Sequence, residues 1–178
     1  MDAEQGRWVR RCLERFEGPL LLYAEGLLRD PHGAQDLVQE AFLRLLGRPR
    51  AEVEPRLPGW LYAVVRNLAI DRMRRGRRME RAATPVLDAT PGAGDPVERA
   101  AARDQAERAV RVLESLPEKQ REALRLRLQH GLAYREIAEV MDVTVNHVGV
   151  LLHEGLKSMR VRLGVVAAPG GAPREATR

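Results

Sequence analysis

Three polar or aromatic side chains recur at intervals of seven residues in the first half of the chain. They are Trp60, Asn67 and Arg74. Seven residues make almost two helical turns, so these side chains would share one stripe of a helix, opposite an apolar stripe that includes Leu61 and Val65. A ring stacks on any unpaired base, an amide reads base edges and a guanidinium contacts phosphate. The segment could therefore hold unstacked nucleic acid. With equal weight, Trp60 could be a core residue and the arginines a solvated helix end.

A second pattern, in the other half of the chain, is a pair of short amphipathic segments joined by a tight turn. Residues 134–141 and 144–163 are separated only by Asp142 and Val143. This is the spacing of a helix-turn-helix, and Ala138 is small where two such helices must cross closely. A helical hairpin without any DNA-binding role has similar spacing, so the pattern alone favours DNA binding and simple packing about equally.

A third pattern is a polar stripe with one apolar member. Asp36, Gln39, Glu40 and Leu43 follow one another at three-to-four spacing, on the side of their expected helix that faces away from its apolar residues. Such a stripe could dock a partner protein. On composition alone, a solvated helix face is the favoured interpretation.

Apolar residues beside these polar stripes recur at helical spacing. Two sets predict helices in the first half of the chain: Leu37, Val38, Ala41, Phe42, Leu45 and Leu46, and then Leu61, Val64, Val65, Leu68 and Ala69. An earlier helix is expected over 8–28. It should be bent or interrupted at Gly18-Pro19, because proline removes a backbone donor and clashes with the preceding turn.

Two proline-containing segments separate the helical patterns. Residues 47–59 contain three prolines and are expected to form a loop. Residues 84–98 read TPVLDATPGAGDPVE, with three acidic residues and no basic one, and they follow the arginine-rich stretch 66–81. This change of composition predicts a linker. After it, further helices are expected over 100–116 and 118–129.

The sequence therefore predicts an all-α chain with two small helical domains joined by a flexible linker. The expected parts are a first domain over 1–81, an acidic linker over 82–99, a helix-turn-helix domain over 100–163 and a disordered tail over 164–178. A 4% aromatic content suits helix packing better than a β-sandwich. The net charge of +5 favours a polyanionic partner, although only modestly.

Several classes of protein are disfavoured by what the chain lacks. The lone Cys12 cannot form an intramolecular disulfide, and no second cysteine or nearby histidine could share a zinc ion with it. The four histidines have no partners at metal-ligand or catalytic spacing, and no glycine-rich phosphate loop follows a strand. The first ten residues lack the order of a signal peptide, and the apolar runs are too short to span a bilayer. We expect a cytoplasmic protein without membrane insertion, enzymatic activity, metal or cofactor.

Three stretches together resemble a known family. They are DLVQEAFLRLL at 36–46, WLYAVVRNLAIDRMRR at 60–75 and LPEKQREALRLRLQHGLAYREIAEVMDVTVNHV at 116–148. They are similar to the sigma-70 family of the extracytoplasmic-function (ECF) type, which keeps only the second and fourth conserved regions of the larger sigma factors. The three matches cover over half of the chain and lie in family order. In the first domain they outweigh the simpler interpretations given above.

The resemblance implies a sigma factor that binds RNA polymerase core and opens promoter DNA, with sigma region 2 in the first domain and sigma region 4 in the second. The residues matching the family's contact with the clamp of the largest polymerase subunit are Asp36, Leu37, Gln39, Glu40 and Leu43. Those matching the face that melts the −10 element are Trp60, Arg66, Asn67, Arg74 and Arg75. The loop before Trp60 matches a pocket for a flipped base. The second domain would dock on the polymerase flap, with its last helix in the −35 major groove.

The recognition helix departs from the family pattern. The family usually has V-G-T-V-K-S-R-L-H-R-A-R, whereas residues 145–156 read VNHVGVLLHEGL, so four expected cations are missing and Glu154 adds repulsion. Weak or unusual −35 recognition is expected, resting on Thr144, Asn146, His147, His153 and Lys157, with phosphate contacts from Arg121 and Arg135. An exposed Val150-Leu151 patch is expected to meet a protein instead, either an anti-sigma factor or an activator.

Two other functions remain open from the residues. One is a helix-turn-helix DNA-binding regulator that never associates with polymerase. The other is a protein-interaction module derived from a sigma factor. The first leaves the stripe from Asp36 to Leu43 without a purpose, and loss of core binding on substitution of Gln39 and Leu43 would distinguish it from a sigma factor.

Overall fold

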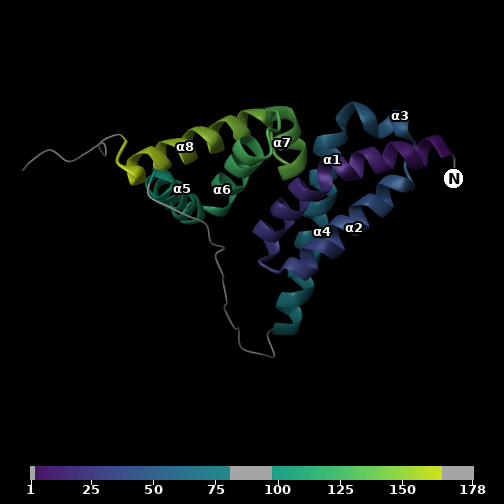
Figure 1. Cartoon of the computed structure of the whole chain (residues 1–178), viewed down its shortest axis with the longest axis horizontal. Helices are drawn as coiled ribbons and strands as arrows, with labels where there is room; N and C mark the ends of the chain where they lie inside the picture. The colour runs from purple at the N-terminus through teal and green to yellow at the C-terminus, as the bar shows by residue number, and fades with distance from the viewer. Residues whose placement is uncertain (1–2, 81–97, 166–178) are drawn as a thin grey trace, which may run out of the picture.

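The computed structural model describes the backbone of residues 3–80 and 98–165, and side chains within 3–76 and 104–165. The expected linker and tail lie almost entirely outside these ranges. Every regular element within them is helical, which confirms the all-α prediction (Figure 1). None of the helices described is long and apolar enough to cross a membrane.

The first domain consists of α1 (Ala3–Leu28), α2 (Pro31–Leu46), α3 (Arg50–Val53), the 3₁₀ turn η1 (Glu54–Arg56) and α4 (Leu57–Glu80). Helices α1, α2 and α4 pack against one another around fully buried side chains such as Leu20, Leu45 and Leu61. The two apolar sets identified in the sequence lie in α2 and α4, so both predicted helices are confirmed.

Of the bend or interruption expected at Gly18-Pro19, the interruption is not observed, and the loop expected over 47–59 is wrong. Helix α1 continues through Pro19, which is exposed, because buried Phe16 and Leu20 on either side anchor both turns to the core. Residues 47–59 do not form a plain loop, since they contain α3, η1 and the start of α4. Pro55 and Pro58 each lie in the first turn of a helical segment, where a missing N–H breaks no hydrogen bond.

The second domain consists of α5 (Glu98–Glu114), α6 (Glu118–Leu124), the π-helical segment η2 (Arg125–Gln129), α7 (Tyr134–Met141) and α8 (Val145–Leu163). Helices α7 and α8 form the predicted helix-turn-helix. Asp142 closes the turn in the left-handed region with φ 54°, and the Thr144 hydroxyl caps α8 by accepting from the His147 backbone N–H at 3.2 Å.

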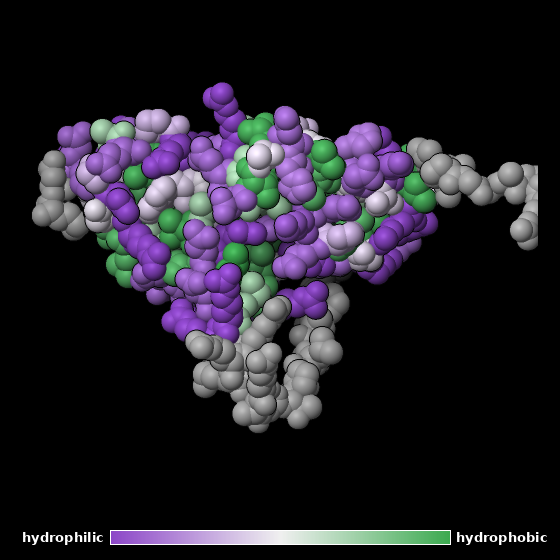
Figure 2. Space-filling view, turned by 180° about the vertical axis from the view of Figure 1, so that it is seen from behind, coloured by the Kyte–Doolittle hydropathy of each residue, from purple (hydrophilic) through white to green (hydrophobic). Residues whose placement is uncertain are grey.

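The two domains are in contact. Helix α7 packs against α4, and the buried apolar side chains of both domains form one continuous cluster. Figure 1 shows α7 beside α1 and α4 at the centre of the molecule, with α5, α6 and α8 on one side and the first domain on the other. Seen from behind, the surface is mostly hydrophilic, with apolar side chains showing between the polar ones (Figure 2).

Candidate nucleic-acid and partner interface

The stripe on α2 offers a mixed surface of carboxylate, amide and leucine. Asp36, Gln39 and Leu43 are exposed, and Leu43 has 62% of its surface open to solvent. Glu40 is half-buried and accepts a 2.9 Å hydrogen bond from Nε of Arg44. Leu37 differs from the other four, because only 6% of it is exposed. It therefore supports the stripe from beneath.

Arg72 of α4 lies beside this stripe, although no sequence pattern singles it out. Its guanidinium donates to Asp36 at 3.0 Å and to Asp30 at 3.4 Å. These contacts join the polar face of α4 to the start of α2. Nothing in the local sequence indicates this role, because both of its partners lie on or next to another helix.

Helix α4 exposes three of the five residues assigned to its nucleic-acid face. Asn67, Arg74 and Arg75 are exposed. Trp60 is half-buried and packs against the core, so part of its ring is available for stacking. Arg66 is the exception, since its side chain is only 18% exposed and forms an ion pair.

The partner of Arg66 is Glu122, on α6 of the second domain. Nε of Arg66 donates to Oε1 of Glu122 at 2.7 Å, and Nη2 donates to Oε2 at 3.3 Å. The hydroxyl of Tyr23 donates to the same Oε1 at 2.8 Å. Burial, together with the charge of Glu122, raises the pKa of Tyr23 well above its usual value, so the phenol stays protonated as a donor. Burial works against the charge on Arg66, but the bonds to Glu122 outweigh it and raise the pKa of the guanidinium.

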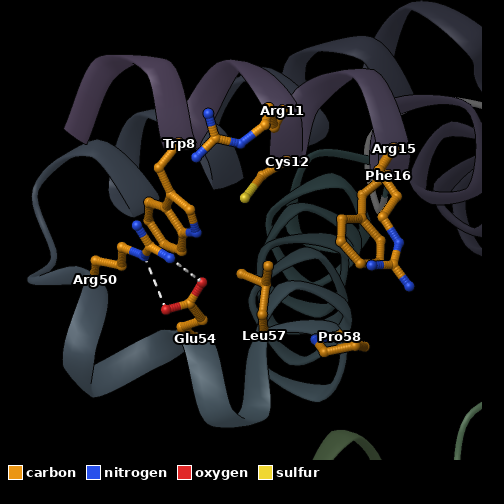
Figure 3. A pocket seen from close by; sticks show the side chains of 9 residues that line it. All are labelled: Trp8, Arg11, Cys12, Arg15, Phe16, Arg50, Glu54, Leu57 and Pro58. Carbon is orange, nitrogen blue, oxygen red and sulfur yellow. Dashed lines mark hydrogen bonds and ion pairs between the residues drawn. The ribbon is translucent and has the colours of Figure 1, made fainter. Parts of the chain in front are cut away.

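A hollow of about 440 Å³ lies between α1 and the segment that was expected to be a loop (Figure 3). Trp8, Cys12 and Phe16 of α1 form its apolar side. On the opposite side, the Arg50 guanidinium lies 6.0 Å from the centre of the Trp8 ring and donates to both oxygens of Glu54, at 2.8 and 2.7 Å. Burial raises the pKa of the Cys12 thiol, which keeps it protonated. Because only 3% of Trp8 is exposed, the group that the hollow offers to a flat, polar ring system is the Arg50 guanidinium, whose side chain is 39% exposed.

The sequence indicated this hollow only through its proline-rich side. The residues of α1 that line it were missed. The available signal was an apolar stripe of Trp8, Cys12 and Phe16 at helical spacing, with Arg11 and Arg15 in the adjoining register.

The outer face of the helix-turn-helix carries little positive charge. Asn146, His147, His153 and Lys157 are exposed on α8, and Arg135 is exposed on α7. They border a shallow depression of about 450 Å³ lined mainly by uncharged side chains: Tyr134, Val145, Asn146, Gly149, Val150, His153 and Glu154.

Three other residues of this domain have internal contacts. Arg121 donates to the backbone carbonyl of Glu114 at 2.7 Å, and Thr144 caps its helix. The expectation of an exposed Val150-Leu151 patch is wrong for Leu151. That side chain is only 8% exposed because it turns into the core, whereas Val150 is 57% exposed.

Within the described residues, no cluster of three or more histidine, cysteine or acidic side chains could hold a metal ion.

Comparison with known proteins gives matches to two family domains. Residues 7–79 match Sigma-70 region 2, and residues 106–159 match Sigma-70, region 4. RNA polymerase sigma-H factor of Pseudomonas aeruginosa is 37% identical over 146 residues, which are 75% of each chain. The ECF RNA polymerase sigma factor SigE of Mycolicibacterium smegmatis is 33% identical over 132 residues, 72% of this chain but only 51% of that one.

One solved structure shares the fold across both domains. It is the sigma factor RpoE from Bartonella quintana, in complex with the anti-sigma factor NepR. The TM-score is 0.62 at 19% identity, and the alignment covers 88% of this chain and 96% of that one.

Proposed function

Since this chain belongs to the sigma-70 family, among its ECF sigma factors, we propose that it binds RNA polymerase core and directs it to promoters, where it helps to open the DNA. The polymerase supplies the chemistry and this chain supplies recognition, so it has no catalytic step of its own. Such a role is carried out where polymerase and promoters are found, in the cytoplasm.

One observation carries this proposal. A single packed domain exposes two different polar surfaces, the stripe Asp36, Gln39 and Leu43 on α2 and the arginine-rich face of α4. A sigma factor must hold an enzyme and a nucleic acid at the same time. A DNA-binding regulator that works without polymerase needs only the second surface.

The α2 stripe is proposed to dock on the clamp of the largest polymerase subunit. Leu43 supplies an exposed apolar anchor, and Asp36, Gln39 and Glu40 supply polar contacts around it. An apolar anchor bordered by polar groups is the usual arrangement of an energetic centre in a protein interface. Leu37, buried under the stripe, keeps its backbone in place.

The α4 face is proposed to hold the melted −10 element. Arg74 and Arg75 are placed to contact phosphates, Asn67 to read a base edge and the open part of Trp60 to stack. An extruded base would enter the hollow beside Trp8 and Arg50. Capturing that base offsets an unstacking cost of roughly a few kcal/mol per step.

The second domain is proposed to dock on the polymerase flap and to contact the −35 element weakly. Few phosphate contacts are available. Of the three cations assigned to this role, Arg135 and Lys157 are exposed, but Arg121 is bonded to the backbone of Glu114. The residues proposed to face the groove lie at the start of α8 and along its side: Thr144, Asn146, His147 and His153. The exposed Val150 fits a protein contact better, and the anti-sigma factor on the structural neighbour suggests the kind of partner.

Reconstitution with purified core polymerase tests the proposal. We expect the chain to bind core, to support run-off transcription and to select defined start sites. Leu43→Glu should abolish core binding, because it places a charge at the apolar anchor. Leu22→Glu is the matched control, since Leu22 is a similarly exposed leucine on α1, at 56%.

Three results would contradict the proposal. If Leu43→Glu and Leu22→Glu bind core equally well, the α2 stripe is not the docking surface. If the chain binds promoter duplex but never core, it is a helix-turn-helix regulator. If it binds regulatory proteins but starts no RNA chains, it is a protein-interaction module.

A further inference from the structure

We propose that the DNA strand whose extruded base enters the hollow beside Arg50 continues along α1, on a track of three exposed arginines: Arg7, Arg11 and Arg15. The track is a binding surface for the sugar-phosphate backbone of single-stranded DNA. It rests on the proposed function, because it extends the nucleic-acid path proposed for α4 and the hollow.

The three arginines lie on one side of α1, next to the residues that form the apolar side of the hollow. They follow one another at intervals of four residues, so each side chain is rotated by only about 40° from the one before. Arg11 and Arg15 line the hollow, and Figure 3 shows them on either side of Cys12, with Arg50 on the opposite side of the hollow. Arg7 continues the row towards the start of the helix. The track therefore begins at the hollow and leads away from it along α1.

The guanidinium groups of the track are available to a ligand. Within the part of the chain that the structure describes, Arg7 and Arg11 form no hydrogen bond or ion pair. The guanidinium of Arg15 lies over the Phe16 ring, 5.0 Å from its centre, and forms no ion pair with a described residue. An arginine without an acidic partner keeps its donors and its charge for a phosphate group.

Arg50, across the hollow, cannot supply this charge. Its guanidinium donates to both oxygens of Glu54 and lies 3.7 Å from a carboxylate oxygen of Glu4. A base in the hollow would meet the flat face of this guanidinium, whereas the phosphate attached to that base needs a cation without an acidic partner. Arg11 and Arg15 meet this need, because they line the same hollow from the other side.

The exposed cations of α4 are too far from the hollow for the same task. Pro58 lines the hollow in the first turn of α4, and Arg74 follows it 16 positions later in the same helix. At 1.5 Å per residue, this separation is roughly 24 Å along the helix axis. A strand held by Arg74 and Arg75 therefore has no support from them at the hollow or beyond it. The arginines of α1 are the exposed cations that border the hollow on its helical side.

The composition of the track indicates contact with backbone rather than with bases. All three members are arginines, and the rings of Trp8 and Phe16 beside them are buried. Four residues rise about 6 Å along α1, so the three guanidinium groups suit successive phosphates of an extended strand. Phosphate contacts hold a strand whatever its sequence. The track should therefore add affinity and salt dependence, but no sequence preference.

Oligonucleotides of two lengths test the track. The probes are fluorescein-labelled non-template strands of a promoter at which the wild-type chain, reconstituted with core polymerase, starts RNA. The short probe contains only the −10 element, and two longer probes add four nucleotides on one side or on the other. Fluorescence anisotropy measures their binding to the polymerase complex across a salt series. The wild type should bind one of the longer probes more tightly than the short one.

The double variant Arg7→Ala/Arg11→Ala should lose this advantage. Its affinity for the preferred longer probe should fall by about tenfold, and the slope of log affinity against log salt should become shallower by about 1.4, because two contacts with a single strand are lost. Binding of the short probe should change by less than about threefold. Binding of core polymerase should not change, and circular dichroism should show the same helical content.

The matched control is Arg10→Ala/Arg108→Ala. It removes the same two charges at exposed arginines outside the track, since Arg10 lies on a different side of α1 and Arg108 lies on α5. This variant should bind all three probes as the wild type does.

Four results would overturn the track. The wild type gains no affinity from either extension, the track variant keeps the gain, or the control variant loses as much as the track variant does, which would reduce the effect to net charge. In the fourth, the track variant loses core binding, and its arginines then contact the polymerase instead of DNA. A wild-type complex that binds none of the probes overturns the proposed function, whereas one that binds only the short probe overturns the track alone.

Discussion

Helices α4 and α8 both face DNA in the proposed function, but with opposite chemistry. The α4 face carries Arg74 and Arg75, both exposed, close to Asn67. Over residues 145–156, α8 carries no lysine or arginine, and it has an exposed Glu154 instead. Phosphate contacts supply most of the affinity of a protein for DNA. In the proposed function, the first domain therefore supplies most of the affinity for DNA, and the second domain mainly positions the chain on it.

The two helices also differ in how they are held. Helix α7 packs against α4, with Glu136 beside Gly59, and Arg66 of α4 is bonded to Glu122 of α6, so part of the α4 face is covered. The outer face of α8 is open to solvent from Asn146 to Lys157. The stronger DNA surface is thus the one that is partly occupied, and the weaker surface is free. Of the arginines assigned to the α4 face, this contact occupies Arg66, whereas Arg74 and Arg75 stay exposed.

Removing the exposed arginines of α4 should have the largest effect. In Arg74→Ala/Arg75→Ala, the affinity of the polymerase complex for promoter DNA should fall by about tenfold or more, because two phosphate contacts are lost. The slope of log affinity against log salt should become shallower by about two. Filter binding across a salt series measures both quantities. Arg10→Ala, at an exposed arginine of α1, is the control, and an equal loss there would remove the special role of α4.

Restoring cations to α8 should narrow the difference between the two helices. Glu154→Arg with Gly149→Lys reintroduces two of the missing charges at positions that are open to solvent or border it. Binding to a −35 duplex should increase by roughly tenfold at low salt, and the gain should diminish as salt rises. Fluorescence anisotropy with the whole chain would detect it. No gain at any salt concentration would mean that α8 does not approach the DNA backbone.

The two glycines of α8 should respond oppositely to the same substitution. Gly149→Ala should stabilise the second domain by up to about 1 kcal/mol, because no atom lies within 4 Å of the new Cβ. Gly155→Ala should destabilise it by about 1 kcal/mol, despite the same gain in helix propensity, because its Cβ would lie 2.8 Å from Cδ1 of the fully buried Leu124. Thermal unfolding compares the two variants. Equal shifts would mean that α6 and α8 are not packed this closely.

This pair of glycines shows what the sequence could and could not predict. Helical periodicity fixed the existence of α2, α4, α7 and α8, because the spacing of apolar residues depends on the local chain alone. It could not separate Gly155 from Gly149, since only the packing of α6 against α8 makes one of them necessary. For the same reason, proline signals predicted an interruption at Pro19 and a loop over 47–59 that the structure does not have, since whether a proline ends a helix depends on what packs around it.

The assignment of site residues was limited in the same way, because a sequence pattern does not show what a side chain contacts. Motif matching selected exposed Asp36, Gln39 and Asn67, but it also selected Arg66, because that residue matches the family pattern whatever its partner is in this chain. The partner, Glu122, lies in a helix with no functional signal of its own. Contacts between domains produce no regular spacing of residues in a sequence, so they become visible only in the folded structure.

Acid should weaken the contact between the two domains that covers part of α4. This is the smallest of the expected effects. Burial, and secondarily the charge of Arg125, lowers the pKa of His130 to about 4. Its Nε2 is buried without a hydrogen-bond partner among the described atoms, and Tyr23 and Tyr62 cover the ring from the first domain. If the two domains separate, the ring is exposed and its pKa should return towards its usual value near 6.5.

The sign follows from that difference in pKa. The chain with its two domains in contact binds fewer protons, so the stability of that contact is complete above about pH 6.5 and decreases as the pH falls towards 4. Small-angle scattering should therefore show expansion at pH 5 relative to pH 7.5, in a chain that circular dichroism shows to be still helical. His130→Gln should remove much of this response. If the variant expands as the wild type does, another group between the two domains titrates, and the His130 imidazole does not link acidity to their contact.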